Sequence, residues 1–307
     1  MNITKPGIYR NFPTAAYFAD PTPEPSLSQS LAKILLEQSP LHAFHAHPRL
    51  HVGVADEDED EGAEKYDSVK AIGNAAHALM LDRGKEVVIG EFKDWRKKEA
   101  RDFRAMNLAN GKEPILSKNF ETAGEMVNEA LAQLSVIPEC ENAFTNGDVE
   151  VVIANCEDGI WLRSMIDWIT PDLREVWDYK TSGKSAAPHV AGKQMADAGW
   201  HIQAAMHERI LDAVDPRGRG RRRHLFVCQE NEPPYALTVN EITEAALTIG
   251  RKKIDYAIRI WRHCRTKHQW PSYPPRINQV VLPTWSETAW LNRELEEEAN
   301  PSLIMAG

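Results

Sequence analysis

The chain has 307 residues, and 36 Lys and Arg against 45 Asp and Glu give a formal net charge of −9. Its hydrophobic share of 42% and charged share of 26% are ordinary for a globular protein. No run of about 18 apolar residues is present, and the first residues show no signal-peptide pattern of a charged head and an apolar run, so we expect a cytosolic protein without a membrane span.

The four cysteines, Cys140, Cys156, Cys228 and Cys264, are far apart in the sequence. Disulfide frameworks, zinc ribbons and iron–sulfur clusters need paired or clustered cysteines. We therefore expect reduced, buried thiols. The acidic balance argues against nonspecific coating of nucleic acid, but it allows an enzyme with a local basic groove.

The first half of the chain is predicted to be mainly helical. Proline-rich residues 1–26 predict an irregular arm, and apolar periodicity predicts helices over 27–38, 70–81, 91–107 and 117–135. Residues 56–61 are six consecutive acids, which predict a solvated loop.

The second half alternates strands and helices. Strands are predicted over 148–155, 160–169, 174–181, 223–229 and 235–240, with helices over 190–214, 241–267 and 286–299. This order predicts a mixed α/β fold, with helices on both faces of a central sheet. We expect an arm at 1–26, one domain at 27–267 (a helical part at 27–138 and a catalytic core at 139–267) and a proline-rich tail at 268–307.

Two strands place chemically active side chains together. Side chains alternate along a strand, so Asp178 and Lys180 share one face. If the strands pair antiparallel through the turn at 171–173, Asp167 lies alongside Asp178. Two carboxylates beside one ammonium suit a divalent cation, Mg²⁺ or Mn²⁺, acting on a phosphodiester, with Lys180 orienting or deprotonating a water. The alternative is an edge aspartate and a solvated lysine, because D-x-K also recurs by chance.

Several motifs together resemble a known family. The runs MIDWI (165–169), WDYKT (177–181) and WHIQAAM (200–206) resemble the PD-(D/E)XK nuclease superfamily. The chain is most similar to its RecE-type exonucleases (exonuclease VIII), which are kin of lambda exonuclease and RecB nuclease domains. The upstream runs LSQSL (27–31), SPLHAF (39–44) and GNAAHAL (73–79) extend the resemblance, which implies a restriction-endonuclease-like core with a helical N-terminal extension.

The resemblance also implies roles for individual residues. It makes His77, Asp167, Asp178 and the Tyr179 backbone carbonyl metal ligands, and Lys180 the catalytic lysine. Glu150 stands where relatives have an acidic residue, so it either contributes to the metal site or is an exposed strand glutamate. For His77, the alternative is an ordinary core histidine.

Two further groups are candidates for DNA contact. Gln203 matches the glutamine of the family's Q-x-x-x-Y motif, but His207 replaces the tyrosine. The two share a helix face, and both can hydrogen-bond a phosphate or a DNA end. The second group is an arginine-rich loop, which either binds phosphate or is merely solvated: Arg217, Arg219, Arg221, Arg222 and Arg223.

The resemblance implies an exonuclease that degrades linear double-stranded DNA from the 5′ end and leaves 3′ single-stranded tails for phage-type recombination. It implies three partners: duplex ends, a single-strand annealing protein and further copies of the chain in a ring-shaped oligomer. It also implies a bacterial cell and a phage or prophage setting. The alternatives are a structure-specific or endonucleolytic enzyme on the same core, or a catalytically silent DNA-binding protein.

Overall fold

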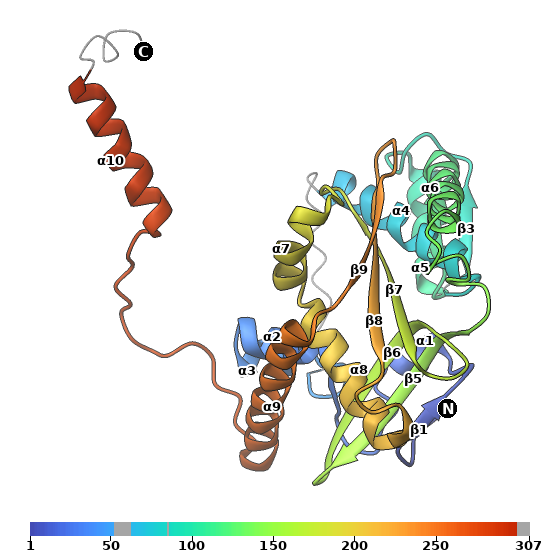
Figure 1. Ribbon diagram of the computed structural model, residues 1–307. Helices are drawn as coiled ribbons and strands as arrows, with labels where there is room; N and C mark the ends of the chain where they lie inside the picture. Colours follow the sequence, from blue (N-terminus) through green and yellow to red (C-terminus); the bar gives the residue numbers. More distant parts are fainter. Residues whose placement is uncertain (52–62, 85, 300–307) are drawn as a thin grey trace. The chain divides into compact units, whose positions relative to one another are not determined.

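The computed structural model describes residues 1–51, 63–84 and 86–299 (Figure 1). The chain divides into two compact units, Met1–Ser272 and Tyr273–Gly307. The second unit contains the helix α10 (Thr284–Ala299), which has no buried residue. Among the described residues, no helix combines the length and hydropathy needed to cross a membrane.

A mixed sheet forms the centre of the first unit. Its described strands follow the order β1-β5-β6-β7-β8-β9, and β2 pairs with β6. The pairs β2–β6 and β7–β8 are parallel, and the other neighbours are antiparallel. The strands are β1 (Gly7–Tyr9), β2 (Leu27–Ser28), β5 (Asp148–Glu157), β6 (Ile160–Ile169), β7 (Glu175–Ser182), β8 (Arg223–Glu230) and β9 (Leu237–Glu241). The predicted mixed α/β fold is confirmed.

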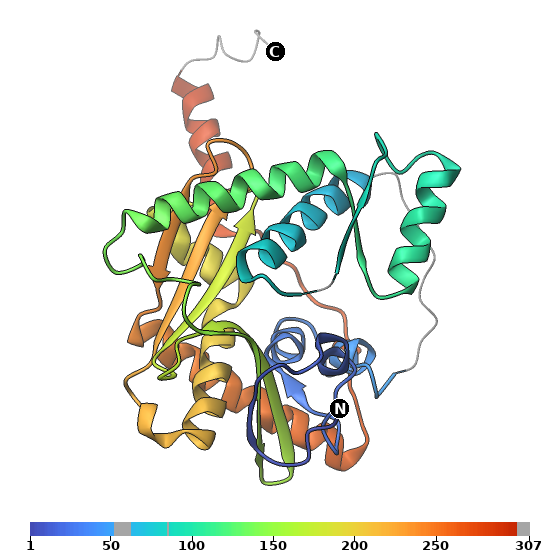
Figure 2. The same cartoon turned by 90° about the vertical axis from the view of Figure 1, so that its right-hand side faces the viewer.

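Helices cover both faces of this sheet, as Figures 1 and 2 show. Alternation along β7 separates two cores: Val176 packs in the core that includes α8 and α9, whereas Trp177 and Tyr179 pack in the core that includes α4 and α6. The first layer comprises α2 (Gln29–Glu37), α3 (Pro40–Ala46), α8 (Trp200–Val214) and α9 (Glu244–Lys267). The second comprises α4 (Ala63–Leu81), α6 (Ser117–Ser135), α5 (Lys98–Ala109) and the parallel pair β3 (Val87–Gly90) and β4 (Glu113–Leu116).

The predicted N-terminal arm is wrong, because residues 1–26 are part of the folded unit. Strand β1 pairs antiparallel with β5. The side chains of Ile3, Phe12 and Tyr17 are buried, the last on α1 (Thr14–Phe18). Asp20 is also buried, and its carboxylate accepts hydrogen bonds from Ser26 and Arg163. Prolines in this segment therefore shape a packed irregular chain rather than a free one.

Other boundaries differ from the prediction for local reasons. The predicted helix 190–214 is two helices, α7 (Pro188–Ala198) and α8, because Gly199 adopts a left-handed conformation with φ of +76°. Helix α5 begins at Lys98, later than the predicted start at 91. The first unit extends to Ser272, beyond the predicted boundary at 267, since Trp270 packs against Trp261. The acidic run 56–61 lies outside the described residues.

Candidate active site

The two carboxylates predicted to be neighbours come from β6 and β7. These strands pair antiparallel, with Trp168 opposite Trp177 and Ile169 opposite Val176. One step further, this register brings Asp167 beside Asp178. The backbone N–H of Tyr179 donates a hydrogen bond of 3.4 Å to Asp167 Oδ2. The predicted antiparallel pairing is confirmed.

Asp178 is buried and held on both of its oxygens. Lys180 Nζ lies 2.5 Å from Asp178 Oδ1, on the same face of β7. The side-chain amide of Gln203, from α8, donates a hydrogen bond to Asp178 Oδ2. Gln203 thus lies at the margin of the site and holds this carboxylate in position. Only 3% of the surface of Asp178 is exposed.

His77 approaches the same site from α4. Its Nε2 lies 3.0 Å from Asp167 Oδ2, and the side chain is partly buried. Helix α4 comes close to β7 at Gly73, where a Cβ atom would lie 2.7 Å from Thr181 Oγ1. A larger residue at position 73 would require the Thr181 side chain or one of the two elements to shift. The close approach therefore places the imidazole within reach of the carboxylates.

The charges of these groups shift one another's pKa values. Burial and the neighbouring Asp167 carboxylate raise the pKa of Asp178 to about 6. Burial acts to raise the pKa of Asp167, but His77 and then Lys180 outweigh it, and the pKa falls to about 2. For Lys180, burial acts to lower the pKa, but Asp178 and Asp167 raise it. The balance for His77 is similar, because Asp167 outweighs burial and raises its pKa. The site thus places two carboxylates against an ammonium and an imidazole whose positive forms they stabilise.

The donor set fits a divalent cation. Asp167 and Asp178 are so close that one of them resists ionisation, and a cation between them would stabilise both charges. The imidazole nitrogen of His77 adds a third donor. Over the described residues, no three His, Cys, Asp or Glu side chains are already arranged as a metal-holding group. Instead, Lys180, Gln203 and His77 occupy the carboxylate oxygens. Metal binding by His77, Asp167, Asp178 and the Tyr179 carbonyl remains a prediction.

Glu150 makes its described contacts with other groups, and its role at the metal site stays a prediction. It is not the exposed strand glutamate of one prediction, because only 4% of its surface is accessible. Its backbone has a φ of +47° within β5, and its carboxylate accepts a hydrogen bond of 2.9 Å from Thr14 Oγ1. Arg83 Nε lies 3.8 Å away. The carboxylate thus joins β5 to α1 and to the segment after α4.

His207 is in the protein interior. It is 2% exposed, and its ring stacks at 6.3 Å on that of His224. Burial lowers the pKa of His207 to about 4 and that of His224 to about 3. The prediction that His207 contacts DNA is therefore wrong for this conformation. Gln203 and His207 lie one helical turn apart; of the two, Gln203 hydrogen-bonds a carboxylate of the site, whereas His207 interacts with Asp167 only through its charge.

The arginine-rich loop does not line the site. Arg223 begins β8 opposite Glu175, whereas Cys228 lies opposite Lys180, so the loop is about 16 Å away along the strands. Arg222 is buried in ion pairs with Asp212 and Asp215. Arg223 pairs with Glu139, Glu175 and Glu241.

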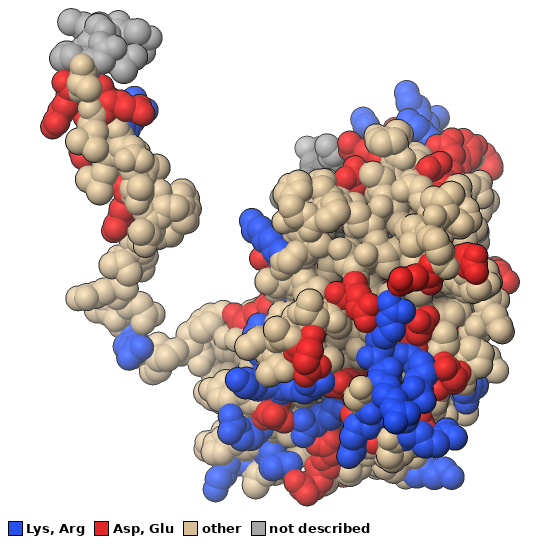
Figure 3. All heavy atoms as spheres, in the orientation of Figure 1, with Lys and Arg blue, Asp and Glu red and all other residues tan. Residues whose placement is uncertain are grey.

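Arg217, Arg219 and Arg221 remain exposed. Of these, Arg217 pairs with Asp215 and Arg219 with Asp212. Figure 3 shows that Lys and Arg side chains gather in a patch on one face of the molecule, with Asp and Glu side chains beside it. Arg222 and Arg223 are thus structural, and only the other three are placed for a phosphate contact.

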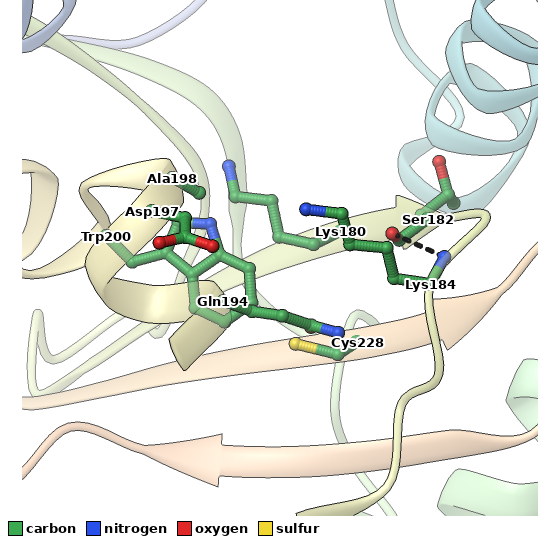
Figure 4. Close-up of a pocket in the computed structure, with 9 residues that line it drawn as sticks. Lys180, Ser182, Lys184, Gln194, Asp197, Ala198, Trp200 and Cys228 are labelled. Carbon is green, nitrogen blue, oxygen red and sulfur yellow. Dashed lines mark hydrogen bonds between the residues drawn. The ribbon is translucent and has the colours of Figure 1, made fainter. Parts of the chain in front are cut away.

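Three cavities meet at the Lys180 side chain. The largest, about 640 Å³, is also lined by Asp167, Gln203 and Arg163. A second, about 460 Å³, includes His77 and Lys70 of α4. A third, about 330 Å³, lies between β7 and α7 (Figure 4). The sequence alone indicated His77, Asp167, Lys180 and Gln203. It did not indicate Arg163, Lys70 or the α7 residues, since these match no motif that we used.

A mixed sheet with two acidic residues and a lysine on adjacent strands defines a PD-(D/E)XK-type domain. A family model described as a PDDEXK-like domain of unknown function (DUF3799) matches residues 52–281. The chain therefore belongs to this family, which confirms the predicted superfamily. Among curated proteins, none is similar enough in sequence to match.

The fold has a solved counterpart. It is the crystal structure of a protein from Eubacterium rectale that is provisionally described as an exonuclease. The two share 11% sequence identity with a TM-score of 0.52, over 91% of this chain and 97% of that one. Similarity at this level shows a shared fold.

Proposed function

We propose that the protein is a metal-dependent exodeoxyribonuclease that degrades linear double-stranded DNA from the 5′ end. The main observation is the convergence of His77, Asp167, Asp178 and Lys180 from three separate elements. A catalytically silent scaffold has no chemical need for this set. The contacts among these four groups support phosphodiester hydrolysis.

Each residue has a distinct task in this proposal. A divalent cation held by His77, Asp167 and Asp178, with the Tyr179 carbonyl, supplies Lewis acidity toward the phosphodiester. The raised pKa keeps Lys180 protonated at neutral pH, so its ammonium offsets the charge that develops on the phosphate. This favours an electrostatic role for Lys180 over the role of general base. Gln203 holds the Asp178 carboxylate in place.

The polarity and biological setting rest on the resemblance to RecE-type exonucleases. It supports 5′-to-3′ degradation, a 3′ tail passed to a single-strand annealing protein and a ring-shaped homo-oligomer around the duplex. It also supports a role in phage or prophage recombination inside a bacterial cell. The description of the Eubacterium rectale protein as an exonuclease supports action at DNA ends.

The test uses three substrates: a 5′-labelled linear duplex, a 3′-labelled linear duplex and a closed circle, each with Mg²⁺, Mn²⁺ or EDTA. The proposal expects early release of the 5′ label with either metal, an intact circle and no reaction in EDTA. Early release of the 3′ label would reverse the polarity, and cutting of the circle would establish an endonuclease. If neither metal supports cleavage, the protein is not a nuclease.

A further inference from the structure

The 330 Å³ cavity beside Lys180 has walls of two kinds. It is lined by apolar groups of Ala198, Trp200 and Cys228, and by polar groups of Ser182, Gln194 and Asp197. Trp200 and Cys228 are largely buried, and Trp200 stacks on Phe226 at 5.2 Å, so this wall is rigid. The volume of the cavity is at the lower end of the range for small-molecule sites. The cavity therefore offers a fixed apolar wall and a polar rim to a small, partly planar ligand.

A second lysine reaches the cavity from the segment after β7. Lys184 is exposed and has no ion pair among the residues that the structure describes, unlike Lys180 with its Asp178 partner. Figure 4 shows the side chains of Lys180 and Lys184 extending in the same direction across the cavity. The Lys184 backbone is fixed by a hydrogen bond of 3.0 Å from its N–H to Ser182 Oγ. An unpaired ammonium at a polar rim favours an anionic ligand.

The cavity also has a defined place in the proposed reaction. Lys180 lines it as well as the two cavities that contain Asp167 and His77. A DNA strand whose scissile phosphate lies at Lys180 must pass its adjoining nucleotides into the neighbouring spaces. The space on the α7 side offers the Trp200 wall for a base and the Lys184 ammonium for a phosphate.

Resting on the proposed nuclease function, we propose that this cavity is a nucleotide subsite. It receives one nucleotide next to the scissile phosphate, with its base against the Trp200 side and its own phosphate at Lys184. Gln194 and Asp197 line the rim from α7, where they offer an amide and a carboxylate to the polar edge of the base. Lys184 is thereby a substrate-binding residue.

The binding test measures affinity for dTMP by saturation-transfer NMR in EDTA, so that cleavage plays no part. Charge-assisted hydrogen bonds contribute about 1.5–3 kcal/mol, so Lys184→Ala is expected to weaken dTMP binding about tenfold or more. Lys193→Ala is the matched control, because Lys193 is an exposed lysine of α7 that does not line the cavity. It should leave the affinity within twofold of wild type. Deoxyribose 5-phosphate, which lacks the base, should bind more weakly than dTMP.

Three results would overturn the subsite: equal affinities for dTMP and deoxyribose 5-phosphate, equal losses in the two lysine variants, or no saturation transfer at millimolar dTMP. This outcome is separable from failure of the nuclease proposal. A protein that binds dTMP through Lys184 but cuts no DNA retains the subsite and loses the nuclease function. A protein that cuts DNA but gives any of the three results retains the nuclease function and loses the subsite.

Discussion

His77 Nε2 and Asp167 Oδ2 lie 3.0 Å apart, although 90 residues separate them in the sequence. The contact joins α4, which packs on one face of the sheet, to β6 within it. The Asp167 carboxylate outweighs burial and raises the pKa of His77. Because only the neutral imidazole can bind a metal, metal binding by His77 would compete with protonation of the same ring.

Lys180→Ala should remove catalysis without removing the fold. The ammonium lies 2.5 Å from Asp178, where it can offset the charge that develops on a phosphate. Loss of one such group lowers kcat by roughly 10²–10³-fold. Cleavage of labelled linear duplex should fall by that factor, while DNA affinity in a gel-shift assay remains within about threefold. Lys193→Ala serves as the control, and near-normal turnover of Lys180→Ala would remove this lysine from the mechanism.

The rate should rise with pH between about 5 and 7. Asp178 has a pKa raised to about 6, so at lower pH its carboxyl is protonated and cannot bind a cation. The raised pKa of His77 acts in the same direction, since a protonated imidazole is no ligand. Initial rates at fixed ionic strength measure the profile. Tenfold more Mg²⁺ should move its midpoint to lower pH by competing with protons, and a profile already flat at pH 5 would contradict this account.

Gly73→Ala should disturb the site from a distance. The new Cβ would lie 2.7 Å from Thr181 Oγ1, so the Thr181 side chain or α4 must shift, and a shift of α4 would move His77 relative to Asp167. We expect weaker Mg²⁺ binding by calorimetry and a lower rate. Thr181→Ala removes that oxygen and leaves only the Cβ of residue 181, at 4.0 Å. The double variant should therefore recover much of the Mg²⁺ affinity and much of the rate.

Gly124→Ala is the matched control for this pair. Gly124 is also a helical glycine, but its added Cβ meets no atom of the described structure within 4 Å. Alanine has the higher helix propensity, so this variant should be neutral or slightly more stable. If Gly73→Ala behaves like Gly124→Ala, the close approach of α4 to β7 does not determine the position of His77.

The arginine-rich loop should separate into two groups. Replacing Arg217, Arg219 and Arg221 with Gln should reduce the slope of log K against log[salt] by about two to three, if each contacts one phosphate. Arg222→Gln should instead lower the free energy of unfolding by about 3–5 kcal/mol, because Asp212 and Asp215 lose their buried partner. Filter binding and chemical denaturation measure the two effects. An unchanged slope would exclude the loop from the DNA interface.

His207 and His224 should make the fold sensitive to acid. Burial holds both pKa values below the ordinary value of 6.5, at about 4 and about 3. Between pH 6.5 and 4 the unfolded chain takes up protons that the folded chain refuses, so stability is lost as pH falls. Between pH 7.5 and pH 5, His224→Leu should lose about 2 kcal/mol less of its free energy of unfolding than the wild type does. His189→Leu is the control at an exposed position, and it should change the pH dependence of stability little. Equal effects of the two variants in denaturant unfolding would contradict this explanation.

Much of the catalytic core could be predicted from the sequence. Long strands with clear alternation and turn signals located β5, β6 and β7, and their antiparallel pairing brought Asp167 beside Asp178. Helix α6 was predicted from Ser117 to Ser135, where the structure also has it. These elements depend on local patterns, which a sequence displays directly.

The remaining features depend on tertiary contacts. Strand β2 has two residues, and its pairing with β6 is visible only when the two are together. The positive φ of Glu150 and the burial of His207 have no sequence signature, because Glu is not a typical left-handed residue and His occurs inside and outside proteins. Likewise, the sequence does not show that two of the five clustered arginines, Arg222 and Arg223, form ion pairs within the fold.

The pairing of β1 with β5 has a practical consequence for any shortened form of the protein. The family match begins at residue 52, yet β1 shields part of one edge of β5, and β2 and α2 complete the sheet and its apolar core. A fragment cut to the matched residues would leave unpaired backbone groups along that edge, next to uncovered apolar side chains. Such edges recruit other chains, so the fragment should aggregate when expressed alone.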